Sequence, residues 1–428
     1  MDIEHLSPRE KRGLLEKILR QKVQAGRPDL EAEAHFDLVC DADVVDLDKE
    51  PQAVFLTGAT GFVGAFVLKR LLDSTSARIY CLVRASDPED GKRRIEANLK
   101  SYELETADLD SRLVPVPGDL TKLHLGLSPD QFRSLAEELD VIYHIGASVN
   151  LAHHYQQLKP TNVNGTREII TLAASGRVKP LHYLSTYAVF DSIHNVGRVF
   201  SEEDEPTQSE GLSNGYSESK WVGEKMVRDC RAAGIPTCIY RVGWVVGDSR
   251  TGAWNSSDFI PRTIKAFLDV GKYCDLGKMT MTPVDYLSEA LVYLSRRRES
   301  VGNIFHLSNG QQYASRELFD WVQSFGYKLQ GVSLKEWEKE IRESSQEISL
   351  TPLLLFLEDV AGGMSSLAQW FSREPHVDVA RTREKLAPAG VVCPGIDEKM
   401  MALYLSYFIS KGFLKPPAKG SREAGRSA

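Results

Sequence analysis

The sequence predicts an α/β fold in which a doubly wound parallel sheet is followed by a smaller, mainly helical C-terminal lobe. From Ala53 onward, short apolar runs of strand length alternate with segments that are long enough for one helix each. A glycine-rich turn joins the first of these runs to its helix, and the alternation weakens after Gly247. Strands that alternate with helices form parallel sheets covered by helices on both faces.

The expected elements begin with an amphipathic helix over residues 7–23. Ser7 is a suitable N-cap, Pro8 stands at the first helical position, and apolar residues follow at helical spacing. Residues 24–50 are acidic without a long period, as in a linker. The expected strands are then 54–56, 79–83, 113–116, 141–144, 180–184 and 237–242, with a later strand over 303–307.

Charge and hydropathy exclude several classes of protein. The chain has 52 Lys and Arg against 59 Asp and Glu, a net charge of −7, which argues against binding nucleic acid through its phosphates. No apolar run approaches the roughly 18 residues of a membrane span. The first four residues, Met1 to Glu4, are acidic where a secretion signal would be basic and then apolar. We therefore expect a cytoplasmic protein with neither nucleic acid nor membrane as a partner.

The cysteines indicate buried thiols. All six stand far apart with no CxxC pair, and Cys81 and Cys238 fall inside predicted strands. The only close histidine pair, His153 and His154, is adjacent in the chain, so the two rings would point apart on a helix. We expect reduced cysteines and no metal site.

The glycine-rich turn after the first strand is typical of a dinucleotide site. Glycines at 58, 61 and 64 allow the turn, a close approach of backbone N–H groups to a pyrophosphate, and tight packing of the helix on the sheet. The strand-to-helix context is the one this Rossmann motif requires. The residues expected to contact the cofactor here are Thr57, Gly58, Thr60, Gly61, Phe62, Val63 and Gly64.

The second strand indicates which cofactor binds. An NAD site usually carries an acid just after this strand, but here Arg84 follows it, and a cation suits the 2′-phosphate of NADPH. Arg94 could close over the same phosphate with its planar guanidinium, whereas Lys92 and Arg93 are expected on a solvated helix face. Asp119 and Leu120, after the third strand, are placed to meet the adenine, although Asp119 could equally cap the next helix.

A Tyr and a Lys provide the candidate catalytic pair. Tyr216 and Lys220 are four residues apart and so share one helix face, and Thr186 follows a strand thirty residues upstream. A tyrosine that donates a proton near neutrality needs its pKa lowered, which a neighbouring ammonium does. We therefore assign catalysis to Thr186, Tyr216 and Lys220, with Tyr216 and Lys220 also contacting the cofactor.

These residues resemble the extended short-chain dehydrogenase/reductase superfamily over about residues 53–309. More narrowly, the segments 185–190, 215–224, 241–252 and 254–259 look like thioester reductase domains. Those domains are the terminal reductases of nonribosomal peptide and polyketide synthetases and of carboxylic acid reductases.

The resemblance implies NADPH-dependent release of an acyl or peptidyl chain from the phosphopantetheine arm of a carrier protein. Hydride would go to the thioester carbonyl carbon, while Tyr216 and Thr186 would stabilise and protonate the oxyanion, and Lys220 would hold the ribose. The hemithioacetal would collapse to an aldehyde, and a second reduction would give an alcohol.

The resemblance and the positions of the predicted strands suggest roles for further residues. Asn162 matches a position that braces the helix behind the active site, and Arg241 and Asp285 could be structural or contact substrate. The expected additional cofactor neighbours are Ala147, Ser148 and Gly243. The expected substrate neighbours are Val149, Asn150, Tyr187, Trp254 and Phe259, with a plain core role open for the last two.

The expected division of the chain follows from these assignments. Residues 1–50 would form the N-terminal helix and linker, and 51–248 the NADP-binding Rossmann domain with a return segment at about 283–310. Residues 249–282 and 311–415 would form the substrate and carrier-docking lobe, and 416–428 a flexible tail. Apolar helix faces are expected at 353–357, 367–371 and 400–408.

The sequence alone leaves other functions open. A fatty acyl-CoA reductase of the male-sterility type would use the same residues on a coenzyme A thioester, and another extended short-chain reductase would act on a small carbonyl compound. A sugar-nucleotide epimerase or dehydratase would usually prefer NAD, which Arg84 disfavours. A catalytically silent NADPH sensor would not need Thr186, Tyr216 and Lys220.

Overall fold

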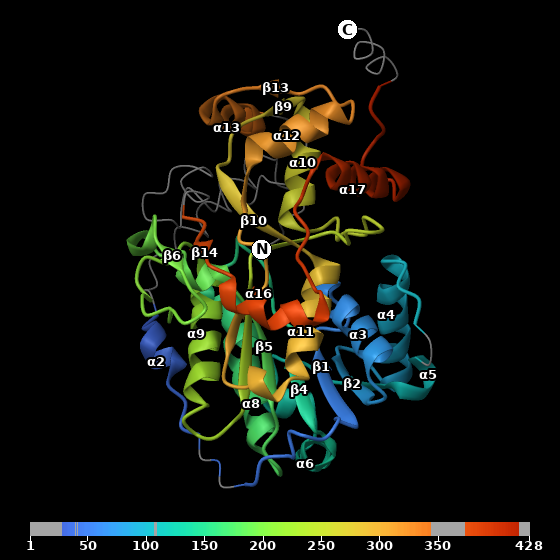
Figure 1. The fold of residues 1–428 in the computed structure, drawn as a ribbon, viewed down its shortest axis with the longest axis vertical. Helices are drawn as coiled ribbons and strands as arrows, with labels where there is room; N and C mark the ends of the chain where they lie inside the picture. Colours follow the sequence, from blue (N-terminus) through green and yellow to red (C-terminus); the bar gives the residue numbers. More distant parts are fainter. Residues whose placement is uncertain (1–27, 39, 41, 107–108, 344–372, 419–428) are drawn as a thin grey trace, which may run out of the picture.

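The computed structural model describes residues 28–38, 40, 42–106, 109–343 and 373–418. Figure 1 shows a sheet body in its lower part and a smaller lobe, mostly of helices, above it. The helix expected at 7–23 and the apolar faces expected at 353–357 and 367–371 lie outside the described residues, as does most of the expected tail.

A seven-stranded parallel sheet forms the centre of the body, which confirms the predicted fold class. Its strands lie in the order β3-β2-β1-β4-β5-β7-β11, and every neighbouring pair is parallel. The order reverses between β1 and β4, and ligands of such sheets bind at the carboxyl ends of the strands beside this reversal. The strands are β1 (Ala53–Thr57), β2 (Arg78–Val83), β3 (Leu113–Pro117), β4 (Val141–His144), β5 (Leu181–Thr186), β7 (Thr237–Val242) and β11 (Ile304–His306).

Helices cover both faces of the sheet because its central strands are apolar on both sides. One face packs against α3 (Phe62–Ser74), α4 (Pro88–Ser101) and α11 (Val284–Ser295). The other packs against α6 (Pro129–Glu138), α8 (Gly165–Ala174) and α9 (Gly215–Asp229), with α2 (Leu30–Ala34) outside α9. Short elements fill the connections: α5 (Leu109–Arg112), η1 (Leu123–Gly126), α7 (Tyr155–Lys159), η2 (Pro160–Asn164), η3 (Tyr187–Phe190), η4 (Ile193–Asn195), β6 (Val199–Phe200) and η5 (Arg298–Ser300).

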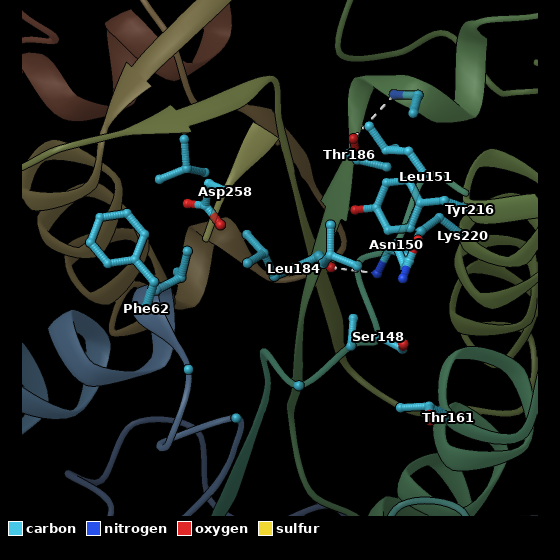
Figure 2. A pocket seen from close by; sticks show the side chains of 18 of the residues that line it. Phe62, Ser148, Asn150, Leu151, Thr161, Leu184, Thr186, Tyr216, Lys220 and Asp258 are labelled. Carbon is cyan, nitrogen blue, oxygen red and sulfur yellow. Dashed lines mark hydrogen bonds between the residues drawn. The ribbon is translucent and has the colours of Figure 1, made fainter. Parts of the chain in front are cut away.

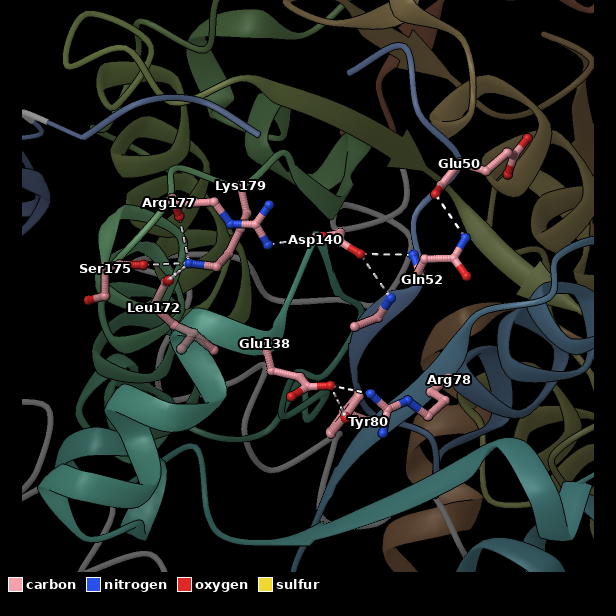
Figure 3. Close-up of polar contacts among 11 residues, drawn as sticks. Glu50, Gln52, Arg78, Tyr80, Glu138, Asp140, Leu172, Ser175, Arg177 and Lys179 are labelled. Atoms are coloured by element: carbon pink, nitrogen blue, oxygen red, sulfur yellow. Dashed lines mark hydrogen bonds and ion pairs between the residues drawn. The ribbon is translucent and has the colours of Figure 1, made fainter. Parts of the chain in front are cut away.

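The amino ends of the strands are held by polar contacts on the edge away from the ligand side. Asp140, just before β4, accepts hydrogen bonds from the backbone N–H groups of Gln52 (2.8 Å) and Ala53 (3.0 Å) (Figure 3). The buried Lys179 ammonium donates to carbonyls at the end of α8, including Arg177 O at 2.6 Å, and burial lowers its pKa to about 8. The Asp140 contacts fix the start of β1 to the start of β4, and the Lys179 contacts hold the chain between α8 and β5.

Within the described residues, the smaller lobe is built on a short sheet and four helices. The sheet pairs β8 (Trp244–Val246) with β10 (Lys278–Pro283) in parallel, and β10 with β12 (Gln312–Ala314) antiparallel. Its apolar core includes Phe267, whose ring lies 4.7 Å from Phe319 and 4.6 Å from Trp337. The helices are α10 (Phe259–Val270), α12 (Ser315–Ser324), α13 (Leu334–Glu343) and α17 (Glu398–Ser410), and β9 (Lys272–Tyr273) pairs with β13 (Gln330–Gly331).

The chain returns to the sheet body before it enters α17. β14 (His376–Val377) pairs with β6, and α16 (Ala380–Leu386), followed by η6 (Ala387–Ala389), packs on α11 and β11. The buried Glu202 holds the start of α16 by accepting from the backbone N–H groups of Arg381 and Thr382, each at 2.8 Å. Part of the range 311–415 therefore contacts the Rossmann body directly.

All six cysteines are free thiols, as the sequence predicts. Four of them, Cys81, Cys230, Cys238 and Cys274, are buried, and Cys40 and Cys393 are half-buried. Burial raises the pKa of the Cys81 thiol well above its usual range, so this thiol stays protonated and unreactive.

Candidate active site

A cavity of about 1180 Å³ extends from the carboxyl ends of β1, β4 and β5 to the inner side of the smaller lobe. Figure 2 shows Thr186, Tyr216 and Lys220 on one side of it and Phe62 and Asp258 on the other. Every predicted site residue lines this cavity except Thr57 and Arg94. The volume is sufficient for a dinucleotide together with a second ligand.

The glycine turn provides the cofactor end of the cavity. Gly58 has φ +84°, and a Cβ on it would lie 2.9 Å from Gly146 Cα, so a side chain is excluded by both conformation and space. A Cβ on Gly64 would lie 1.9 Å from Gly58 O, which shows how closely α3 approaches the turn. This backbone cradle and the α3 N-terminus fit a pyrophosphate, so the residues present suit a dinucleotide.

Thr57 supports the turn from behind. Its hydroxyl oxygen accepts from Gly146 N at 2.9 Å and lies 2.8 Å from His144 Nδ1. The His144 ring is fully enclosed, and burial lowers its pKa to about 3, so the imidazole is neutral. Thr57 thus ties β1 to β4 and contacts the turn without facing the cavity.

The cations near β2 lie in two different environments. Arg84, at the end of β2, is exposed and lines the cavity. Arg94 is also exposed, but it donates to the backbone carbonyl of Arg84 and does not line the cavity. Lys92 forms an ion pair with Asp110 at 2.8 Å and Arg93 with Asp90 at 3.1 Å, on the solvated face expected for them. Asp119 and Leu120 line the same end of the cavity, and Asp119 accepts from Thr121 N at 2.9 Å.

Tyr216 and Lys220 are presented by the first turns of α9. Asn214 caps this helix by accepting from Ser217 N at 3.0 Å. The Lys220 ammonium donates to Tyr183 Oη at 2.7 Å and to Leu184 O at 2.8 Å. These two contacts fix the ammonium against the end of β5, the strand that also carries Thr186.

The electrostatics of the pair follow from their enclosure. Loss of water raises the pKa of Tyr216 to about 12, which is the opposite of the lowering by Lys220 that the sequence analysis expects, and the hydrogen bond with Thr186 offsets this only in part. Burial lowers the pKa of Lys220 to about 7, and the carboxylate of Glu224 counteracts this. The Tyr216 hydroxyl is therefore a proton donor in the resting site, and Lys220 changes charge near neutrality.

Asn162 braces the site as expected. Its amide oxygen accepts from Ser148 N at 2.7 Å, and its amide nitrogen donates to Ser148 O and to Ser219 Oγ, both at 3.0 Å. Asn162 thereby connects the loop after β4 to α9. Asp285 is also structural, because its carboxylate accepts from the backbone N–H and the hydroxyl of Ser249 at 3.0 and 2.6 Å.

A buried ion pair lies behind the candidate catalytic residues. Arg241, in β7, and Glu224, one helical turn beyond Lys220, are both fully enclosed, with a shortest N–O distance of 2.6 Å. Glu224 also accepts from Ser185 Oγ at 2.5 Å, and the Arg241 guanidinium lowers the pKa of Glu224 against the effect of burial. The sequence analysis missed Glu224; the signal is a carboxylate four residues after Lys220 on an otherwise buried helix face.

The residues that line the substrate half of the cavity differ in part from the substrate neighbours predicted from the sequence. Val149, Asn150, Tyr187 and Phe259 line it, with Val149 68% exposed. Trp254 touches the cavity but is only 2% exposed, because its ring packs on Tyr404 and Phe408. The sequence analysis did not identify several further residues that line this half: Asp191, Trp244, Asp258, Arg373 and Glu374.

Three of these residues are carboxyls set into the cavity wall. Burial raises the pKa of Asp191 to about 6 and those of Asp258 and Glu374 to about 7. Asp191 accepts from Ser217 Oγ at 2.6 Å beside Tyr216, and Asp258 accepts from Asn255 Nδ2 at 2.7 Å. Near neutral pH these side chains carry less negative charge than their number suggests.

Within the described residues, no group of three or more His, Cys, Asp or Glu side chains is arranged to hold a metal ion. No helix among the same residues is both long and apolar enough to cross a membrane.

Known proteins resemble this chain in both sequence and structure. Residues 56–291 match the NAD-binding family model described as male sterility protein. A component of linear gramicidin synthase from Brevibacillus parabrevis is 39% identical over 417 residues, which cover 94% of this chain and 8% of that protein. Glycine betaine reductase ATRR of Emericella nidulans is 33% identical over 90% of this chain and 30% of its own length. The chain thus spans a minor part of these relatives.

Two solved structures indicate which group within this family the chain resembles. The terminal R domain from the myxalamid PKS-NRPS biosynthetic pathway is 39% identical, with a TM-score of 0.84 over 91% of this chain and 99% of that one. The reductase (R) domain of a nonribosomal peptide synthetase from Mycobacterium tuberculosis shares the fold, at 23% identity and a TM-score of 0.68 over 93% of this chain and 99% of its own. Both the family model and the near-complete match to a terminal R domain therefore show that this chain belongs to the NAD-binding male-sterility family and, within it, to the terminal reductase domains.

Proposed function

We propose that this chain uses NADPH to reduce an acyl or peptidyl thioester carried on the phosphopantetheine arm of a carrier protein, and that it releases an aldehyde. The observation that carries this proposal is the continuous cavity that runs from the glycine turn past Tyr216 into the smaller lobe. A cofactor and an extended thioester can share that space. Arg84 at the cavity wall favours the 2′-phosphate of NADPH.

Thr186, Tyr216 and Lys220 have different roles in the proposed reduction. NADPH, when bound, supplies a hydride to the thioester carbonyl carbon. The Tyr216 hydroxyl, together with Thr186, stabilises the negative charge that develops on the carbonyl oxygen and donates the proton to it. Lys220, held by Tyr183 and Leu184, orients the ribose. Its ammonium also stabilises the tyrosinate that forms when Tyr216 donates its proton to the substrate oxygen.

Release requires one further bond to break. The hemithioacetal carbon–sulfur bond cleaves, the thiol of the pantetheine arm leaves with the hydroxyl proton, and an aldehyde remains. If the aldehyde returns after cofactor exchange, the same Tyr216 proton donor and a second hydride give a primary alcohol. Both routes use the same three side chains.

The test offers one acyl group on two thiols. NADPH oxidation is measured with the acyl group on a phosphopantetheinylated carrier protein and on coenzyme A, and the product is identified by mass spectrometry. Faster turnover from the carrier is expected. Preference for the coenzyme A thioester would instead indicate a fatty acyl-CoA reductase. No oxidation with either thioester, with Tyr216-dependent reduction of small aldehydes or ketones, would overturn the proposal.

A further inference from the structure

Two oxygen atoms of β5 hold the Lys220 ammonium. It lies 2.7 Å from Tyr183 Oη and 2.8 Å from Leu184 O, and 4.1 Å from the centre of the Tyr183 ring. An ammonium has three N–H bonds. Among the described residues these two oxygens are its acceptors, so one N–H bond remains for a ligand in the cavity that Lys220 lines. Because the three bonds are tetrahedral, fixing two of them sets the direction of the third.

Tyr183 is a neutral acceptor for this ammonium. It is buried, and burial raises the pKa of Tyr183 well above its usual range, so the hydroxyl keeps its proton. The ammonium has no lone pair, so the hydroxyl proton goes to another group. Tyr183 hydrogen-bonds with Thr166 of α8, and Thr166 donates its own proton to Asn162 O at 2.7 Å. The Tyr183 hydroxyl therefore donates to Thr166 and presents its lone pairs to Lys220.

The neutral His144 ring fixes Thr166 from the sheet. His144 Nε2 lies 3.1 Å from Thr166 Oγ1, and His144 Nδ1 lies 2.8 Å from Thr57 Oγ1. Because the Thr166 proton goes to Asn162, Thr166 accepts from His144, and the hydrogen of the neutral ring is on Nε2. Hydrogen bonds thus connect the tyrosine that holds Lys220 to β1, the strand that leads into the glycine turn.

Gly223 leaves the space that the Tyr183 hydroxyl occupies. It lies on α9, three residues after Lys220. A Cβ at this position would lie 2.6 Å from Tyr183 Oη and 3.2 Å from Asn162 O. Glycine inside a helix is less stable than alanine, but a side chain here would push the hydroxyl away from Lys220. The contact therefore depends on α9 as well as on β5.

We propose that Tyr183 is a positioning residue for the reduction: its hydroxyl, oriented by Thr166 and given room by Gly223, keeps Lys220 as an ammonium and aims the remaining N–H bond at the cofactor. This inference rests on the proposed function, in which Lys220 holds the ribose. It adds a residue that acts through Lys220 and does not itself touch the cofactor.

The charge of Lys220 gives this contact a measurable signature. Burial lowers the pKa of Lys220 to about 7. The titratable groups around it are Tyr216 and Glu224 on its own helix, His144 on β4 and Tyr183 on β5. Near neutral pH, Glu224 is ionised and the other three are uncharged. Removing the Tyr183 hydroxyl takes an acceptor away from the charged form of Lys220 and should lower its pKa further.

The first measurement follows Lys220 directly. The protein is prepared with lysine labelled with ¹³C at Cε, and NMR follows the Lys220 resonance, assigned with Lys220→Arg, as the pH is changed. Tyr183→Phe keeps the ring and should lower the titration midpoint by about one pH unit. Tyr143→Phe is the matched control, because Tyr143 is also buried but its hydroxyl bonds with Ser295 Oγ at 2.8 Å. It should leave the midpoint unchanged.

The second measurement is the affinity for NADP⁺, determined by calorimetry at about pH 5.5 and about pH 8. If the midpoint falls by about one unit, the fraction of Lys220 that is charged falls much more at the higher pH. The loss of affinity in Tyr183→Phe should therefore be about sevenfold larger at pH 8 than at pH 5.5. General damage to the site would weaken binding equally at both pH values.

Gly223→Ala tests the same contact from α9. The added Cβ meets the Tyr183 hydroxyl, so this substitution should lower the Lys220 midpoint as Tyr183→Phe does. Without that hydroxyl, the nearest atom to the Cβ is Asn162 O at 3.2 Å. Gly223→Ala should therefore add nothing to Tyr183→Phe.

Several outcomes would overturn the inference. An unchanged or raised midpoint in Tyr183→Phe, or an equal fall in Tyr143→Phe, would show that the hydroxyl does not act on Lys220. Additive shifts from Gly223→Ala and Tyr183→Phe would show that Gly223 acts by another route. Equal loss of NADP⁺ affinity at both pH values would separate Tyr183 from the cofactor. The NMR titration needs neither cofactor nor thioester, so its result stands if no thioester is reduced, and the two proposals fail separately.

Discussion

Glu224 accepts a 2.5 Å hydrogen bond from the Ser185 hydroxyl, which joins the helix of Tyr216 and Lys220 to the strand of Thr186. The same carboxylate is paired with the enclosed Arg241. The three candidate catalytic side chains are thus held in one geometry by an ion pair that lies behind them. Such a buried pair costs much when one partner is removed, even where its net contribution is small.

We expect Glu224→Gln to lower the free energy of unfolding by about 3–5 kcal/mol, because it leaves the Arg241 guanidinium buried without a counter-charge. Denaturant unfolding followed by circular dichroism measures this change. Glu289→Gln is the control, since Glu289 pairs with Arg70 where both side chains are about two-fifths exposed. That change should cost less than about 1 kcal/mol. Equal effects of the two substitutions would contradict the role of Glu224.

Replacing Tyr216 by Phe removes the proton donor and keeps the ring. We expect kcat to fall by about 10²–10⁴-fold while the affinity for NADPH stays unchanged. Steady-state oxidation of NADPH and a binding titration give the two numbers. Tyr293→Phe, on α11 and outside the cavity, is the matched control and should leave both at wild-type values. An active Tyr216→Phe enzyme would remove Tyr216 from the mechanism.

Cofactor choice is predicted to depend on Arg84. Arg84→Ala should raise the Kd for NADPH by about tenfold and leave that for NADH unchanged, because only NADPH carries the 2′-phosphate. Calorimetry with both cofactors measures the difference. Arg93→Ala provides the comparison, because Arg93 is engaged with Asp90. If Arg84→Ala weakens both cofactors equally, Arg84 has another role.

Stability should fall in acid because of the buried histidines. Burial lowers the pKa values of His144, His182 and His306 from 6.5 to about 3. Between these pH values the unfolded chain binds protons that the folded chain does not, so stability is lost as the pH falls from about 6.5 towards 3. The raised pKa values of Asp191 and Glu374 act in the opposite direction, because the folded chain binds those protons first.

A substitution isolates one histidine from these opposing effects. His182→Asn should make the stability of the protein less dependent on pH between 6.5 and 3, relative to the wild type. Unfolding midpoints across this pH range measure the slope. His35→Asn, at an exposed position, should leave the slope unchanged. The same slope in His182→Asn and the wild type would show that His182 is not the source of acid sensitivity.

The sequence was sufficient for the parts of the site that depend on local spacing. Gly58, Gly61 and Gly64 lie within one turn, and Tyr216 and Lys220 lie one helical turn apart, so their geometry follows from backbone rules. The parallel pairing of the strands also follows, because strands that alternate with helices form parallel sheets.

Contacts between distant segments were not predictable in this way. Glu374 meets Trp244 across 130 residues, and no periodic pattern connects them. Trp254 and Trp244 are ten residues apart and equally apolar, and only the packing of Tyr404 and Phe408 shows that Trp254 belongs largely to the core. Arg94 likewise contacts a backbone carbonyl, which has no signal in a sequence.

The return of β14 and α16 to the sheet body has a consequence for joining parts of two related reductase domains in one chain. Leu386, on α16, is almost fully enclosed against the sheet body, and Glu202 of that body holds the N-terminus of the same helix. A chimera joined between α12 and β14 would combine halves that did not evolve together across this contact. A junction placed after α17 leaves the contact within one parent.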